Sequence, residues 1–211
     1  FRPGSRGVSL VGLLPERPQR GKSGLRDLKR MARNFDALFQ AHCVDVEQGR
    51  PTPEKSLQSW MTAQAYRHDR RFISLCSDGR DIMFVADELA LPRAGGGRMV
   101  CDFLAIRRGP HGYCRPAVIE LKSARQLSRL VDQVCGYAAC MAQLSDEFAA
   151  LYSAVLGESV AFDGPPECWI VWPRQGESVD PREEELCASG IRVVGYQAQG
   201  DGYTFRVGRE P

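Results

Sequence analysis

Three charged residues interrupt apolar stretches of this chain. Asp102 lies in MVCDFLAI, and Glu120 and Lys122 lie in AVIELK. Successive side chains of a β-strand point to opposite faces, so Glu120 and Lys122 share one face and Leu121 lies on the other. A charge in a buried strand is costly unless it is paired or bound to a metal. The alternative is a strand that runs out into solvent, where the two charges form a weak surface pair.

The spacing of these residues indicates the chemistry that they can do. Asp102 precedes Glu120 by eighteen residues, and the short connection over residues 109–115 predicts that their strands are antiparallel neighbours. The two carboxylates then lie near one another and repel unless a cation sits between them. Mg²⁺ suits such a place because it takes oxygen ligands and keeps several waters. The Lys122 ammonium can orient or deprotonate a water, or offset charge on a phosphoryl oxygen.

Asp102 followed by the Glu-Leu-Lys of residues 120–122 resembles the PD-(D/E)XK nuclease superfamily. Gln133 and Tyr137, in DQVCGYA, resemble the Q-x-x-x-Y signature of the exonuclease-related branch of that superfamily. They are four residues apart and therefore share a helix face. Upstream, Glu54 in PEKSLQSW resembles the acidic residue on the first core helix of these enzymes.

The resemblance covers about residues 53–140 and has one departure. Val100 and Cys101 stand where the motif has Pro before its Asp. The resemblance implies a restriction-endonuclease-like fold with an αβββαβ core. It also implies a Mg²⁺-dependent nuclease acting on DNA, with Mn²⁺ as a substitute metal, which works alone or within a larger repair or defence complex.

The resemblance assigns a role to each site residue. Asp102, Glu120 and the carbonyl of Leu121 would hold Mg²⁺, with Glu54 joining through a water. Lys122 would position the attacking water. Of the helix pair, Gln133 would steady the site, and Tyr137 would pack or contact the substrate backbone.

Each of these residues also has a purely structural interpretation. Glu54 would be an acid favoured by the helix dipole at a helix N-terminus. Gln133 would be a surface amide, Tyr137 a half-buried core ring, and Asp102 a buried hydrogen-bonded acid. The corresponding function is a catalytically idle module of the same fold that binds nucleic acid or a protein partner. The intact set of Asp102, Glu120 and Lys122 favours an active enzyme.

The elements that must position these residues follow from the apolar periodicity and from Gly and Pro positions. Thr52 and Pro53 mark the start of a helix as N-cap and first helical residue. Helices are predicted over residues 25–39, 54–68, 125–144, 145–156 and 183–187, and strands over 72–76, 82–86, 99–106, 117–122, 168–172, 191–196 and 203–207. This order predicts an α/β fold: a central mixed β-sheet flanked by helices on both faces.

Composition and charge limit the class of protein. The chain has 211 residues, 43% of them hydrophobic and 26% charged, and a net charge of +2, as in an ordinary globular protein. Residues 1–50 hold ten Lys or Arg against five Asp or Glu. We therefore predict a basic N-terminal arm with an amphipathic helix over 1–50, and a nuclease-like domain over 51–211. The arm would contact phosphates or remain a solvated tail.

The sequence also predicts the surroundings of the protein. No apolar run is long enough to span a membrane, and no signal peptide is visible, so we expect a cytoplasmic protein without a membrane partner. The chain begins with Phe, from which we expect a trimmed chain or a missing partner domain. None of the eight cysteines forms a C-x-x-C pair, so most are predicted to be small buried hydrophobes in a reducing compartment.

Overall fold

The computed structural model describes residues 52–75, 81–92, 98–109, 113–123, 130–174, 181–200 and 202–208. The predicted arm over residues 1–50, with its amphipathic helix over 25–39, lies outside the described residues. Among the helices that are described, none combines the length and the apolar character needed to cross a membrane.

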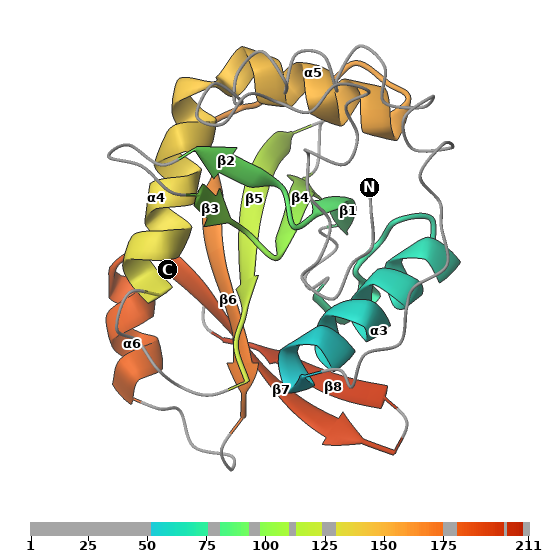
Figure 1. Ribbon diagram of the computed structural model, residues 1–211, viewed down its shortest axis with the longest axis vertical. Helices are drawn as coiled ribbons and strands as arrows, with labels where there is room; N and C mark the ends of the chain where they lie inside the picture. The colour runs from blue at the N-terminus through green and yellow to red at the C-terminus, as the bar shows by residue number, and fades with distance from the viewer. Residues whose placement is uncertain are drawn as a thin grey trace.

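A six-stranded mixed sheet forms the centre of the described fold (Figure 1). Its strands, in spatial order, are β1 (Asp81–Asp87), β4 (Phe103–Arg108), β5 (Cys114–Leu121), β6 (Glu167–Pro173), β7 (Ile191–Gln199) and β8 (Gly202–Val207). The pairs β1–β4, β4–β5 and β7–β8 are antiparallel, and β5–β6 and β6–β7 are parallel. A separate two-stranded sheet joins β2 (Ala90–Pro92) to β3 (Arg98–Val100).

Helices cover both faces of the large sheet, as predicted. Helix α3 (Pro53–Arg67) lies on one face, whereas α4 (Leu130–Gln143), α5 (Ser145–Leu156) and α6 (Pro181–Ala188) contribute to the core on the other face. Figure 1 shows α3 and α4 on opposite sides of β5. The alternation of apolar side chains along β5 divides the two cores, because Val118 faces the α4 side and Ile119 faces the α3 side.

Helix α3 begins where the sequence predicts. The Thr52 hydroxyl accepts a hydrogen bond from the Lys55 N–H at 3.3 Å, and Pro53 occupies the first helical position. Leu57 and Met61 are buried against the sheet. The cap and the buried side chains together fix the direction in which the first turn of α3 points.

Two predictions about the strands are wrong in detail. Within the segment predicted as a strand over 72–76, Ile73–Leu75 form a short 3-10 helix. The residues before it pair briefly with β1, through an isolated bridge between Arg71 and Met83 and a hydrogen bond from the Phe72 N–H to the Ile82 carbonyl at 2.7 Å. Phe72 and Leu75 are both buried while Ile73 is exposed. A spacing of three residues brings two side chains to one side in a 3-10 turn, whereas a strand would separate them.

The predicted strand over 99–106 is divided into two. Strand β3 ends at Val100 and pairs with β2, and β4 begins at Phe103 in the large sheet. Cys101 and Asp102 form the bend between the two sheets. Asp102 therefore lies at the entrance of β4 and not inside a strand.

The cysteines follow the prediction in part. The six in the described residues are free. Cys101 is buried, but the other five are only partly buried. Most described cysteines are therefore more accessible than the sequence analysis predicted.

Candidate functional site

The pairing of the start of β4 with the end of β5 brings Asp102 close to Glu120 and Leu121. The two strands pair in the register Phe103 with Ile119, as the short connection predicted. One carboxylate oxygen of Asp102, Oδ2, accepts the N–H of Leu121 at 2.7 Å. Burial raises the pKa of Asp102, and this Leu121 N–H opposes the shift. The bend before β4 thus places the Asp102 carboxylate within hydrogen-bond distance of the backbone N–H of Leu121, the residue between Glu120 and Lys122.

Glu120 is a buried acid with one bonded oxygen and one unbonded oxygen. Its Oε1 accepts Lys122 Nζ at 2.8 Å and Gln133 Nε2 at 2.5 Å. Its Oε2 is buried and has no hydrogen-bond partner. Burial, and then the charge of Asp102, raise the pKa of Glu120 to about 7. A buried acceptor without a donor is uncommon and calls for a ligand or a proton.

Lys122 directly follows β5, and its side chain reaches Glu120, as the alternation predicted. Its ammonium is paired with Glu120 and its side chain is 24% exposed. Burial is the largest single influence on the pKa of Lys122 and lowers it, but the charge and hydrogen bond of Glu120, together with the charges of Asp102 and Glu54, raise it overall. The Lys122 carbonyl accepts the Tyr196 hydroxyl at 3.3 Å, and its N–H donates to the Val171 carbonyl at 2.8 Å. The lysine is therefore a cation on a fixed section of backbone.

The two residues of the helix motif have different positions. Gln133, in the first turns of α4, donates from Nε2 to Glu120 and also to the Val100 carbonyl at 3.1 Å. Tyr137 is fully buried, and its hydroxyl donates to the Leu89 carbonyl at 2.9 Å. The structure thus brings Gln133 to Glu120. The Tyr137 ring instead packs in the core, and its hydroxyl is hydrogen-bonded to the backbone of the segment that follows β1.

Glu54 joins the start of α3 to the end of β5. Its Oε1 accepts the N–H of Ser123 at 2.9 Å and the Ser123 hydroxyl at 3.2 Å. Ser123 directly follows Lys122, so Glu54 lies beside the site residues without a hydrogen bond to Asp102 or Glu120. The other oxygen of Glu54 remains available for a water.

Sequence reasoning missed a second set of polar residues behind Asp102. The Asp102 carbonyl accepts Gln58 Nε2 at 3.3 Å and the N–H of Glu88 at 3.2 Å. Lys55 donates to Gln58 Oε1 at 2.8 Å and is ion-paired with Glu88. The chain offered one signal for this set: adjacent acids, Asp87 and Glu88, directly after the apolar residues of β1.

The donor set determines which metal the site would suit. Within the described ranges, no three His, Cys, Asp or Glu side chains form a group that could hold a metal ion. Transition-metal sites rely on such groups, whereas Mg²⁺ keeps several waters and uses one or two carboxylates. The buried and unbonded Oε2 of Glu120, close to the Asp102 charge, fits a hard cation of this kind.

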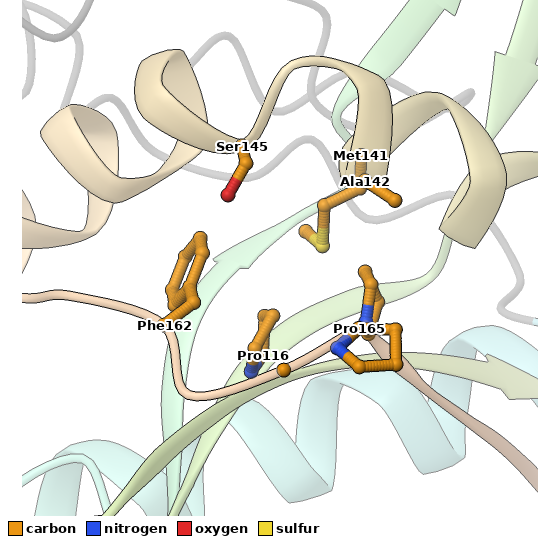
Figure 2. A pocket seen from close by; sticks show the side chains of 8 residues that line it. Pro116, Met141, Ala142, Ser145, Phe162 and Pro165 are labelled. Atoms are coloured by element: carbon orange, nitrogen blue, oxygen red, sulfur yellow. The ribbon is translucent and has the colours of Figure 1, made fainter.

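A pocket lies away from these residues, at the start of β5 (Figure 2). Its volume is about 340 Å³. It is lined by Pro116, Met141, Ala142, Ser145, Phe162, Gly164, Pro165 and Pro166. Pro116 and Glu120 are four residues apart on β5, which corresponds to roughly 13 Å along a strand. None of these lining residues is Asp, Glu, Lys or His, and Ser145 contributes the one side-chain hydroxyl among them.

Comparison of the chain with protein-family models, with curated proteins and with solved structures found no match in any of the three.

Proposed function

We propose that this protein is a metal-dependent nuclease that hydrolyses DNA phosphodiester bonds on a restriction-endonuclease-like core. The observation that carries the proposal is the Oε2 atom of Glu120, which is buried and has no hydrogen-bond partner. Glu120 also lies close to a second carboxylate, that of Asp102, and to the Lys122 ammonium. The order of elements is consistent with the proposal. Helix α3 precedes β1, β4 and β5, the antiparallel strands of the large sheet, with β2 and β3 inserted between β1 and β4, and after α4 and α5 the parallel strand β6 follows.

The ligands of the metal would come from two adjoining strands. Asp102, Glu120 and the Leu121 carbonyl would hold Mg²⁺ or Mn²⁺, and Glu54 would contribute through a water. Bound there, the metal would supply a more acidic water and positive charge for the phosphoryl oxygens. The bond from the Leu121 N–H to Asp102 limits the rotation of that carboxylate. The site would therefore be formed before the metal arrives.

The remaining side chains would orient groups and provide charge. Lys122 stays an ammonium, because Glu120 raises its pKa, so it would act on a phosphoryl oxygen or on the attacking water as a cation. Gln133 would hold the Glu120 carboxylate in one orientation through its hydrogen bond. Tyr137 would act indirectly, since its buried ring fixes α4 against the sheet.

A second candidate function is a catalytically idle module that binds DNA or a protein partner, for example in a repair or defence complex. The Glu120–Lys122 ion pair favours it, because each charge already satisfies the other without a metal. This candidate predicts nucleic-acid binding that is unaffected by EDTA and no hydrolysis with any divalent metal.

Cleavage assays distinguish the two candidates. Labelled single-stranded and double-stranded DNA, and a matching RNA, are incubated with Mg²⁺, Mn²⁺ or EDTA. The proposal expects cleavage of DNA with either metal and none with EDTA, and loss of cleavage in Asp102→Asn and Glu120→Gln. Asp81→Asn is the matched control, because its carboxylate is 43% exposed and pairs with Arg71 on the surface. Cleavage by Glu120→Gln at the rate of the Asp81→Asn control would contradict the assignment.

A further inference from the structure

Asp102 is held by hydrogen bonds from three parts of the fold. Its carbonyl accepts Gln58 Nε2, 44 residues away in the chain, and the N–H of Glu88. Its carboxylate accepts the N–H of Leu121 at 2.7 Å. Because Asp102 lies at a bend between two sheets, no continuous strand ladder fixes it. These hydrogen bonds from α3, the end of β1 and β5 therefore replace the ladder.

Lys55 connects two of the groups behind Asp102. It donates to Gln58 Oε1 at 2.8 Å, which directs the amide N–H₂ of Gln58 toward the Asp102 carbonyl. It is also ion-paired with Glu88, whose side chain is only 6% exposed. Glu88 has φ of +48°, a region that residues other than glycine seldom adopt. The Lys55 charge thus stabilises a buried acid on an unfavourable backbone turn.

Simple helix-to-sheet packing does not require this arrangement. Leu57 and Met61 already attach α3 to the sheet through apolar contacts. Gln58 is 6% exposed, and burying a polar side chain costs free energy that an apolar side chain of similar size would not cost. We therefore assign the Gln58 side chain mainly to the orientation of its hydrogen-bond partners and not to the attachment of α3 to the sheet.

We propose that Gln58 and Lys55 are positioning residues that set the orientation of Asp102 in the site. Gln58 acts through the Asp102 carbonyl, and Lys55 acts through Gln58 and Glu88. Neither residue belongs to the proposed set of metal ligands. The consequence for catalysis rests on the proposed nuclease function, whereas the orientation of Asp102 is a property of the metal-free protein.

Two substitutions separate the roles of the Gln58 amide. Gln58→Met removes both hydrogen bonds and keeps the volume. Gln58→Glu keeps an acceptor for Lys55 but removes the N–H donor to Asp102. We expect both to lower single-turnover cleavage and to raise the half-saturating Mg²⁺ concentration by about tenfold, the usual effect of losing an outer-shell contact. Lys55→Met should behave in the same direction, and Lys55→Arg should restore most of the loss.

Gln64→Met is the matched control. Gln64 lies on the same helix, and its side chain makes no hydrogen bond within the described part of the chain. Circular dichroism and urea unfolding verify that each variant folds. If Gln58→Met equals Gln64→Met within twofold in both cleavage and Mg²⁺ dependence, while the parent cleaves, the positioning inference fails and the nuclease proposal stands.

Amide hydrogen exchange of Leu121 tests the inference without catalysis. The Leu121 N–H donates a hydrogen bond to the Asp102 carboxylate, and this bond slows the exchange of the amide hydrogen. In the metal-free protein, kept in EDTA, displacement of the carboxylate should therefore accelerate exchange of this amide. We expect at least fivefold faster exchange in Gln58→Met and no change in Gln64→Met. A parent that never cleaves DNA would remove the proposed function, but faster Leu121 exchange would still support the positioning role. Unchanged Leu121 exchange in Gln58→Met would overturn it.

Discussion

The side-chain amide of Gln133 on α4 donates to the carboxylate of Glu120 on β5 at 2.5 Å. This contact joins a helix to the end of a central strand, and it occupies the same oxygen that accepts Lys122. The other oxygen of Glu120 is left unbonded. Gln133 thus determines which of the two oxygens faces the helix and which stays available.

Removing the Gln133 amide should weaken the site without unfolding the protein. In Gln133→Met, Glu120 loses a hydrogen bond to a charged group, which typically contributes about 1.5–3 kcal/mol. We expect cleavage to fall by about tenfold to a hundredfold. The measurement is single-turnover cleavage at several Mg²⁺ concentrations. Gln143→Met, an exposed glutamine on the same helix, is the control. Equal rates for the two variants would remove Gln133 from the site.

Glu120 should make the metal-free protein less stable as the pH rises. Its folded pKa of about 7 exceeds the ordinary value of 4.5, so the folded state binds more protons between these pH values. The protonated form contributes stability that is present below about pH 4.5 and lost as the pH rises through 7. The loss is of the order of 3 kcal/mol at most.

Urea unfolding in EDTA at pH 5.5 and pH 8 measures this effect. Burial also raises the pKa of Asp102, so that residue changes stability in the same direction. Glu120→Gln should reduce the difference in unfolding free energy between pH 5.5 and pH 8. At pH 8, Mg²⁺ should stabilise the parent more than it stabilises this variant. A parent whose stability rises from pH 5.5 to pH 8 in EDTA would show that Glu120 is not the buried acid described above.

Lys122 should need its charge more than its length. Lys122→Met keeps the aliphatic stem but removes the ammonium, so developing charge on the phosphoryl group loses its partner. The loss of one such donor costs roughly 2.7–4 kcal/mol, or about a hundredfold to a thousandfold in rate. Lys122→Arg keeps the charge as a planar fork and should be impaired less. Single-turnover cleavage of a short duplex and of its single strand measures both variants, and a Lys122→Met rate within threefold of the parent would make the lysine half of a structural ion pair.

Tyr137 should affect stability and not chemistry. Tyr137→Phe leaves the buried Leu89 carbonyl without its donor, which costs about 1–3 kcal/mol of unfolding free energy. Tyr152→Phe is the matched control, because its buried hydroxyl donates to the Ala105 carbonyl in the same way. Both variants should cleave at the parental rate per folded molecule. A selective loss of cleavage in Tyr137→Phe would restore the substrate-contact role that the sequence motif implied.

Local patterns in the sequence were sufficient for part of the site. Alternation along AVIELK brought the Glu120 and Lys122 side chains together, because the period of a strand is fixed by its backbone. The short connection before β5 made β4 and β5 antiparallel neighbours and so brought Asp102 beside AVIELK. Thr52 and Pro53 marked the start of α3 through capping, which also depends on a few adjacent residues.

Other features of the fold depended on contacts that no local pattern encodes. The apolar residues 72–76 fit a strand or a 3-10 turn equally well, and burial of both Phe72 and Leu75 in one core decided for the turn. Gln133 and Tyr137 share a helix face by spacing. Only the packing of α4 determined that Gln133 reaches Glu120 while Tyr137 enters the core.

The residues behind Asp102 belonged entirely to the tertiary structure. Gln58 donates a hydrogen bond to the Asp102 carbonyl, which is 44 residues away in the sequence. Lys55, on α3, forms an ion pair with Glu88, which follows β1. A lysine and a glutamine on a helix have no periodicity that distinguishes a buried partner from solvent. Their role was decided when α3 packed on the sheet, because a buried carbonyl and a buried carboxylate then needed a donor and a cation at those positions.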